Sequence, residues 1–217
     1  FLRVCSGTFT RDMKVFHSRT GKTLRLASSQ RVFGRDRETV DVAFPGDVIG
    51  LVGHSGFGIG DTLTEDPELT YEPLPQFAPE CFALLHNPSS STYKRFRAGL
   101  AHLLQEGAVQ AFALKDSVQI LPLLGAVGAL QFDVLQYRLE NEYGAASRLE
   151  PMSWRLIRWV APEDVGHEAL RDGKLPMGCR LATDASGRTV ALFNTDWELK
   201  YFSDRNPGVR LLKLPAD

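Results

Sequence analysis

The stretch that most constrains the fold is residues 121–144, LPLLGAVGALQFDVLQYRLENEYG. Its first four residues are an apolar run of strand length, and Gly125 and Gly128 then indicate a tight turn. Gly144 stands where a left-handed residue commonly ends a helix. We therefore predict a strand, a glycine turn and a helix with its apolar side chains on one broad face. These side chains are Leu130, Phe132, Val134, Leu135, Leu139 and Tyr143.

The turn from Gly125 to Gly128 has two interpretations. Free backbone N–H groups at the start of a helix bind phosphate, which would make the turn a small-ligand site. Alternatively, the glycines allow the helix to pack closely against its own strand. We favour packing, because the stretch has neither the GxGxxG pattern of a dinucleotide site nor the lysine of a P-loop.

Composition restricts the class of protein. A chain of 217 residues that is 43% hydrophobic can bury the cores of one or two domains. Three separated cysteines (Cys5, Cys81 and Cys179) without CxxC spacing argue for a reducing compartment and against disulfides or structural zinc. No apolar run approaches 18 residues and no signal peptide is evident, so we expect a soluble, cytoplasmic protein without a membrane partner. We also expect a monomer. Phe1 opens a strand-like segment, which suggests a fragment of a longer polypeptide.

The charges are distributed unevenly. Residues 1–37 hold nine Lys or Arg and two acids, whereas residues 38–72 hold eight acids and no Lys or Arg. The basic part can neutralise phosphates of a nucleic acid, or it can pair internally with the acidic part. The sequence leaves both interpretations open.

The first 72 residues have the pattern of an all-β domain. Short alternating segments are separated by turn residues, and Gly21-Lys22-Thr23 is a hairpin turn without the first glycine or the helix of a P-loop. We predict a small closed or nearly closed antiparallel β-barrel. Its expected strands are residues 3–9, 13–17, 23–26, 30–33, 39–43, 47–52 and 61–64.

Four prolines between residues 65 and 79 indicate a stiff linker, so we place the boundary between domains 1–72 and 73–217. The second domain has the order β, α, β, β, α, β of a ferredoxin-like α+β fold. Its expected strands are 80–86, 108–114, 118–124 and 148–160. Ser91 is expected to cap its first helix, and its second helix is expected from Leu130. From about residue 161 we expect an α/β extension of the same domain, with a helix at 162–171, a strand at 189–194, a capped helix at 195–204 and a strand at 209–214.

The first helix of this domain carries Lys94, Arg95 and Arg97 in its first turns, where the helix dipole disfavours cations. A solvated surface or an anionic partner accounts for them.

No catalytic group is evident in the sequence. Cys81 stands among apolar neighbours as an inert thiol, and the five histidines lack metal-ligand spacing. Asp133, Glu140 and Glu142 fit the outer face of a helix. We therefore expect a binding or docking module that is not itself an enzyme.

Two groups of motifs resemble known families. Segments 1–9 (FLRVCSGTF), 13–15 (MKV), 43–51 (AFPGDVIGL) and 59–63 (IGDTL) resemble the second, barrel domain of translational GTPases. Segments 75–80 (PQFAPE), 106–110 (EGAVQ) and 125–135 (GAVGALQFDVL), with Arg138-Leu139 and Glu142-Tyr143, resemble the bacterial peptide chain release factor 3 family. The likeness is strong over about residues 1–160 and looser beyond.

The resemblance implies an upstream GTP-binding domain that holds GTP or GDP with magnesium and carries out hydrolysis. It also implies action on the bacterial ribosome, both rRNA and ribosomal proteins, to remove class-I release factors after peptide release. Contacts are expected first at Gly7, Arg11, Arg35 and Arg37, and then at Lys94, Arg95 and Arg97.

In one place the sequence departs from the family, which usually has glycine where Asp12 stands. Aspartate tolerates the left-handed conformation better than most residues, so we expect the turn to persist. The alternatives are the equivalent fragment of another translational GTPase, such as an elongation factor G relative, and a stand-alone enzyme or small-ligand binder that uses the Gly125–Gly128 turn.

Overall fold

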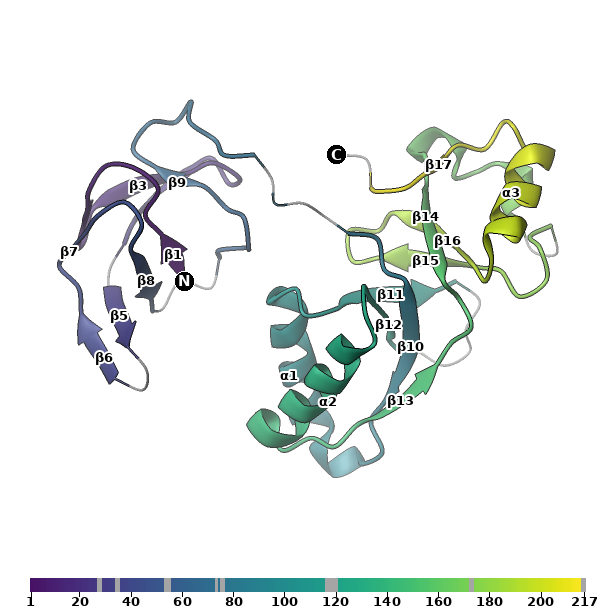
Figure 1. Cartoon of the computed structure of the whole chain (residues 1–217), viewed down its shortest axis with the longest axis horizontal. Helices are drawn as coiled ribbons and strands as arrows, with labels where there is room; N and C mark the ends of the chain where they lie inside the picture. The colour runs from purple at the N-terminus through teal and green to yellow at the C-terminus, as the bar shows by residue number, and fades with distance from the viewer. Residues whose placement is uncertain are drawn as a thin grey trace. The chain divides into compact units, whose positions relative to one another are not determined.

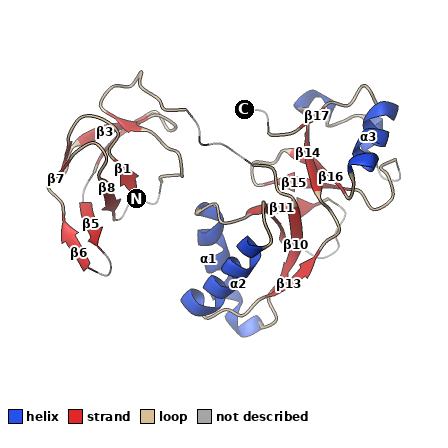
Figure 2. Cartoon of the chain, viewed as in Figure 1, coloured by secondary structure: helices blue, strands red, loops and turns tan. Residues whose placement is uncertain are grey.

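The computed structural model describes residues 1–26, 29–33, 36–52, 56–72, 74, 77–115, 121–171 and 174–215, and gives the backbone alone for 29–33 and 36–38. The chain divides into two compact units, Phe1–Pro75 and Gln76–Asp217, called here the N-terminal and C-terminal units (Figure 1). Among the described residues, the N-terminal unit contains strands and no helix, whereas the C-terminal unit combines strands with helices (Figure 2). The predicted separation into folding domains at residue 72 stays a prediction.

The N-terminal unit is all β, as predicted. Its described strands form three antiparallel sheets, with the strand orders β1-β8-β5-β6, β2-β7 and β4-β3-β9. Among the described residues, these three sheets do not join into a closed barrel. The strands are β1 (Leu2–Arg3), β2 (Phe9–Thr10), β3 (Lys14–His17), β4 (Lys22–Arg25), β5 (Ser29–Phe33), β6 (Asp36–Thr39), β7 (Val42–Ala43), β8 (Val48–Leu51) and β9 (Leu63–Thr64).

Turns in this unit shorten two of the predicted strands. The expected strand 3–9 is wrong, because Gly7 adopts a φ of 69° between β1 and β2 and interrupts the extended backbone. The expected strand 39–43 covers the end of β6 and all of β7. The hairpin predicted at Gly21 is confirmed between β3 and β4, and Asp12 adopts the left-handed conformation expected of it, with a φ of 66°.

One apolar core is shared by the three sheets of the N-terminal unit. Its buried members come from strands or turns of every sheet, so side-chain packing holds together what backbone hydrogen bonds do not connect. They are Val4, Phe9, Val15, Leu26, Val40, Ala43 and Ile49.

The C-terminal unit is built on one eight-stranded antiparallel sheet in the order β13-β10-β12-β11-β15-β16-β14-β17. The strands are β10 (Cys81–His86), β11 (Gln110–Leu114), β12 (Leu123–Ala126), β13 (Arg148–Pro151), β14 (Leu156–Val160), β15 (Arg180–Asp184), β16 (Thr189–Phe193) and β17 (Leu211–Leu212). The helices are α1 (Tyr93–Gln105), α2 (Leu130–Tyr143) and α3 (Asp196–Arg205), with one-turn 3-10 helices η1 (Ser90–Thr92), η2 (Pro162–Asp164) and η3 (Glu168–Leu170).

The ferredoxin-like part is confirmed by the order of its elements, β10, α1, β11, β12, α2 and β13. Its four strands occupy one end of the sheet, and α1 and α2 lie together on one face (Figure 1). The segment beyond residue 161 adds to the same sheet, because β15 pairs with β11 and not with a separate domain.

Several predicted boundaries in the C-terminal unit are wrong. The expected strand 148–160 is two strands, because Trp154 turns inward and its Nε1 donates to the carbonyl of Gly178 at 2.8 Å. Strand β15 was not predicted, since its sequence RLATD has no run of β-branched or aromatic residues. The expected helix 162–171 is two 3-10 turns, η2 and η3. The capping box of Thr195 and Glu198 is confirmed.

Helix α2 also differs from the prediction of one broad apolar face. Phe132, Leu135 and Leu139 are buried against the sheet, whereas Leu130 and Val134 are exposed. The reason is geometric, since residues 130 and 134 lie one turn apart on the side opposite to 132, 135 and 139. The sheet can cover only one of these two sides.

Candidate functional site

The glycine stretch does not form a free phosphate cradle. Gly125 lies inside β12 and not in the turn, contrary to the prediction. The Oε1 atom of Gln131 accepts the N–H groups of Val127 at 2.8 Å and Gly128 at 3.1 Å, while its Nε2 donates to the carbonyl of Ala108. These two donors, which a phosphate would need, already have a partner within the chain.

The packing interpretation holds for Gly125 alone. A Cβ atom at this position would stand 2.8 Å from the ring of Phe112 and 2.9 Å from Pro79, closer than side chains approach. A Cβ atom at Gly128 would meet nothing within 4 Å. One glycine therefore allows close packing of the central strand, and the other stands in open space.

The outer side of α1 carries exposed cations beside an aromatic ring, a combination of groups that suits an anion. Phe96 and Leu103 are buried on its inner side, and the opposite side exposes Tyr93, Lys94 and Arg97. The guanidinium of Arg97 stacks on the ring of Tyr93 at 5.8 Å, and a shallow hollow is lined by Tyr93, Lys94, Arg97 and Ala98. We call these four residues the α1 basic face.

Neither Lys94 nor Arg97 makes an ion pair within the part of the chain that the structure describes. No acid stands in the first turn of α1 to offset them. The face therefore keeps two cations and one aromatic ring available to a partner.

Arg95, the third predicted contact on this helix, points elsewhere. Its Nη1 lies 3.0 Å from the position of a Cβ on Gly144, the left-handed residue that ends α2. The carbonyl groups at a helix C-terminus carry partial negative charge, which a cation stabilises. We assign Arg95 to the contact between α1 and α2, apart from the α1 basic face.

The candidates in the N-terminal unit are placed only in part. Gly7 and Arg11 lie before and after β2, and Arg11 makes an exposed ion pair with Asp41 at 3.4 Å. Arg35 lies outside the described residues, and Arg37 is described by its backbone alone. Of these three arginines, the structure therefore describes the side chain of Arg11 alone, and the predicted grouping stays a prediction.

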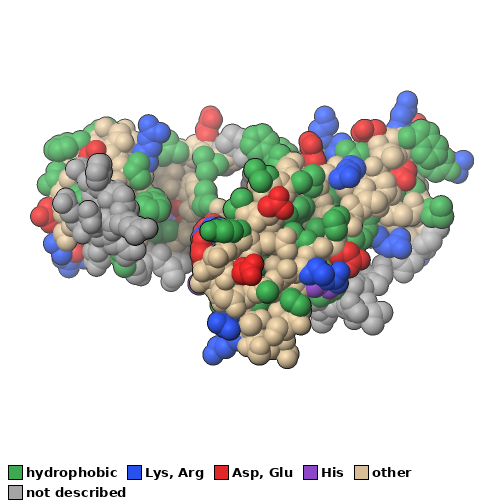
Figure 3. Space-filling model, turned by 60° about the horizontal axis from the view of Figure 1, so that its bottom comes forward, with side chains coloured by type: hydrophobic (Ala, Val, Ile, Leu, Met, Phe, Trp, Pro, Cys, Tyr) green, Lys and Arg blue, Asp and Glu red, His purple; other side chains and the backbone are tan. Residues whose placement is uncertain are grey.

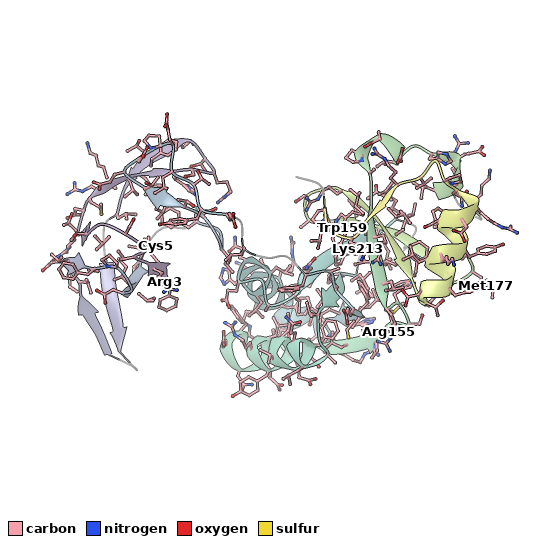
Figure 4. All side chains as sticks on the ribbon, turned by 45° about the horizontal axis from the view of Figure 1, so that its top comes forward. Arg3, Cys5, Arg155, Trp159, Met177 and Lys213 are labelled. Atoms are coloured by element: carbon pink, nitrogen blue, oxygen red, sulfur yellow. The ribbon has the colours of Figure 1, made fainter. Side chains whose placement is uncertain are left out.

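Ion pairs account for part of the uneven charge. Arg11 and Arg19 of the basic segment pair with Asp41 and Asp61 of the acidic segment. Other cations have no ion pair among the residues the structure describes: Arg3, at the end of β1 beside Cys5 (Figure 4), and Lys14 and Lys22 on β3 and β4. Internal pairing with the acidic part therefore applies to Arg11 and Arg19, whereas Arg3, Lys14 and Lys22 stay available for phosphates. The two signs of charge are interspersed over the face of the molecule that Figure 3 shows.

A partly buried polar network centres on Asp61, and sequence reasoning missed it. The carboxylate accepts hydrogen bonds from Arg19 Nε at 2.6 Å, His17 Nε2 at 2.8 Å and the N–H of Gly58 at 2.6 Å. The hydrogen bond from Arg19 holds the pKa of Asp61 well below its usual range, against the effect of burial. More than 40 residues separate Asp61 from Arg19 and His17, so no local pattern could reveal the network.

The network is structural in character. His17 is buried and its Nδ1 lies 2.9 Å from the hydroxyl of Thr20, while Arg19 also donates to the carbonyl of Gly56 at 3.0 Å. It ties the glycine-rich segment before β9 to the hairpin of β3 and β4. All its polar groups are satisfied within the chain, which leaves little for a ligand.

The cysteines and histidines form no catalytic pair among the residues that the structure describes. His86 contacts Glu150 at 2.9 Å and His102 contacts the hydroxyl of Tyr143 at 3.2 Å, so each ring has its own partner away from Cys81. Burial, with Glu198 nearby, raises the pKa of the Cys179 thiol to about 12. Within the same described part of the chain, no three His, Cys, Asp or Glu side chains are arranged to hold a metal ion.

One small cavity of about 230 Å³ lies between α1, β11 and the hairpin of β15 and β16. Its carboxylate, Asp184, accepts hydrogen bonds from Trp159 Nε1 at 2.9 Å and Arg188 Nε at 2.8 Å. Burial raises the pKa of Asp184, but these bonds outweigh it and hold the pKa below its usual value. The cavity therefore offers no unpartnered carboxylate to a ligand. No helix in the described part of the chain is long and apolar enough to cross a membrane.

Comparison with known families decides between the remaining possibilities. The family model of the class II release factor RF3 C-terminal domain matches residues 71–203, and that of elongation factor G domain 2 matches residues 1–66. The first match covers more than half of the chain. The chain belongs to the peptide chain release factor 3 family.

Relatives of this family match almost the whole chain. Peptide chain release factor 3 of Synechococcus elongatus is 45% identical over 211 residues, which are 97% of this chain and 37% of the relative. That of Gloeothece citriformis is 42% identical over 214 residues, 99% of this chain and 39% of the relative. The chain thus spans less than two fifths of the length of these release factors.

A solved structure supports the fold. A crystal structure of a protein from Thermus thermophilus matches 71% of this chain with a TM-score of 0.56, and the match covers 25% of that protein. At 19% identity, the likeness concerns the fold alone. The motif in residues 125–135 that resembles release factor 3 agrees with the family found by comparison of sequences.

Proposed function

We propose that this chain is the ribosome-docking portion of a GTP-dependent translation termination factor. The complete factor promotes dissociation of class-I release factors from the ribosome after peptide release. GTP or GDP with magnesium binds an upstream domain, which carries out hydrolysis, and the 217 residues themselves have no catalytic role. The factor acts in the cytoplasm as a monomer.

The observation that carries the proposal is the match of residues 71–203 to the release factor RF3 C-terminal domain. The α1 basic face supports it, because exposed cations beside an aromatic ring suit the phosphates and bases of rRNA. In the N-terminal unit, Gly7, Arg11, Arg35 and Arg37 remain the proposed contacts. Arg95 supports the α1 basic face indirectly by fixing α1 against α2.

The proposal is tested by co-sedimentation of the chain with bacterial 70S ribosomes over a range of salt concentrations. We expect binding that weakens as salt rises, because neutralised phosphates release counterions. Replacing Lys94 and Arg97 by alanine should weaken binding at low salt and reduce the slope of log affinity against log salt by about one for each lost phosphate contact.

The matched control removes two exposed lysines elsewhere, Lys200 on α3 and Lys213 beside Trp159 (Figure 4). The Lys200→Ala and Lys213→Ala double variant has the same change in net charge and should keep the slope of the unaltered chain. Equal losses of ribosome affinity in the two double variants would show that net charge alone, and not the α1 basic face, determines binding. Binding or hydrolysis of GTP by these 217 residues alone would contradict the proposed function.

A further inference from the structure

The polar network centred on Asp61 ends in a hydroxyl group at the surface of the N-terminal unit. Thr20 belongs to the turn between β3 and β4 and is exposed. Its Oγ1 atom lies 2.9 Å from Nδ1 of His17, and Nε2 of the same ring lies 2.8 Å from Oδ2 of Asp61. Hydroxyl, imidazole and carboxylate therefore form one continuous row of hydrogen bonds that runs inward from the surface.

The carboxylate determines which nitrogen of the neutral His17 ring carries the hydrogen. Because Arg19 donates to Asp61 and keeps the pKa of Asp61 well below its usual range, the carboxylate is ionised and can only accept. The hydrogen therefore stands on Nε2, and Nδ1 accepts from the hydroxyl of Thr20. Phe57 packs edge-on against the ring, with the two centroids 5.4 Å apart. An imidazole held in this way acts as a base toward a hydroxyl nucleophile.

The charges around Thr20 favour an anionic reactant. Residues 13–35 contain six Lys or Arg and no Asp or Glu. The side chain of Arg19, directly before Thr20, is 55% exposed although it pairs with Asp61. Lys22, two residues after Thr20, is exposed and makes no ion pair among the described residues. Such a group of cations raises the local concentration of a negatively charged reactant.

We propose that Thr20 is an acylation site whose acyl donor is a small acyl phosphate. Oγ1 attacks the carbonyl carbon of the donor, and the hydroxyl proton passes to Nδ1 of His17 and from there to the departing phosphate. The bond between the carbonyl carbon and the phosphate oxygen breaks, and its electron pair leaves with the phosphate. The products are an ester at Thr20 and inorganic phosphate. Asp61 is a positioning residue, because it acts through His17.

The chain is the substrate of this reaction and not an enzyme, because the hydroxyl of Thr20 is consumed once. The reaction needs neither a ribosome nor GTP, so it is independent of the proposed function. An ester oxygen at Thr20 has no hydrogen to donate to Nδ1 of His17. Acylation therefore breaks the link between the turn and the network that holds the glycine-rich segment before β9.

The test incubates the whole chain with acetyl phosphate and follows each threonine by tandem mass spectrometry. Alkaline hydroxylamine cleaves esters and leaves acetylated lysines intact, so it separates the two products. Thr23 is the internal control, since it is exposed in the same basic hairpin and has no histidine partner among the described residues. Thr20 should be acetylated at least about tenfold faster than Thr23. Equal rates, or a phosphoryl group on Thr20 in place of the acetyl group, would overturn the inference.

Variants separate activation of the hydroxyl from its structural role. His17→Gln keeps an N–H donor for Asp61 but removes the nitrogen that accepts from Thr20, so acetylation at position 20 should fall to the rate at Thr23. Thr20→Ser keeps the hydroxyl and should stay reactive. Amide hydrogen exchange shows whether each variant is folded. Fast acetylation of Thr20 in folded His17→Gln would overturn the inference. If that variant does not fold, Asp61→Asn replaces it, because an amide can donate to Nε2 and leave the hydrogen on Nδ1, and an unchanged rate at Thr20 would then overturn the inference.

Discussion

Replacing Gly125 by alanine is expected to lower the free energy of unfolding of the C-terminal unit by about 2 kcal/mol, within the usual range for overpacked cores. The new Cβ would stand 2.8 Å from the ring of Phe112 and 2.9 Å from Pro79. Gly125 lies in β12, which pairs with both β10 and β11, so the strand cannot move without disturbing its neighbours.

The matched control is Gly128→Ala, three residues along the same stretch. Its Cβ would meet nothing within 4 Å, and its φ is not among the positive values, so the expected change is below about 0.5 kcal/mol. Both variants are measured by urea unfolding with tryptophan fluorescence. Because the three tryptophans stand at positions 154, 159 and 197, the signal reports the C-terminal unit. Similar losses in the two variants would contradict the assignment of close packing to Gly125 alone.

Replacing Asp61 by asparagine is expected to destabilise the N-terminal unit by about 1 to 2 kcal/mol at neutral pH, since solvent screens the pair with the partly exposed Arg19. The change removes the charge that Arg19 and His17 surround and leaves the buried ring of His17 and the partly exposed guanidinium of Arg19 with a weaker acceptor. Amide hydrogen exchange of residues 1–72 is the suitable measurement, since this unit has no tryptophan. The control Asp41→Asn breaks an exposed ion pair with Arg11 and should cost less than about 1 kcal/mol.

The same network predicts a dependence on pH. The pKa of Asp61 in the folded state lies below its value in the unfolded chain, because Arg19 donates to the carboxylate. Its contribution to stability is therefore complete above the unfolded pKa of about 4 and is lost as pH falls from there toward the folded pKa. The protection of the N-terminal unit should fall in that acid range, and Asp61→Asn should lose less there. An equal fall in both proteins would contradict the role given to Asp61.

Local patterns in the sequence identified most elements correctly. The apolar spacing of α1, the capping box of α3 and the cap of α2 at Gly144 could be predicted because each depends on residues within a turn or two of one another. The cap expected at Ser91 is wrong, because Ser91 lies in η1 and Thr92 precedes α1 without a side-chain cap. The order of strands and helices likewise gave the ferredoxin-like fold, since few topologies satisfy that order. The left-handed turn at Asp12 is also a local property.

Boundaries failed where tertiary contacts interrupt a local pattern. Trp154 divides the predicted strand 148–160 because its indole finds a carbonyl at Gly178, 24 residues away. Strand β15 forms because β11 and β16 are available on either side to pair with it. Neither partner can be recognised from the residues of the strand itself.

For the candidate site, the sequence by itself identified the three cations at the start of α1, the glycine stretch and the family that the stretch resembles. Only the tertiary structure separated Arg95, which lies at the end of α2, from Lys94 and Arg97, which remain exposed. It also gave the donors at Val127 and Gly128 a partner in Gln131, and it left Leu130, Val134 and Tyr137 on the outside of a helix for which one apolar face was expected. The physical reason is the same in each case. Spacing along the chain determines which side of an element a residue occupies, but the neighbouring elements alone determine which side is covered.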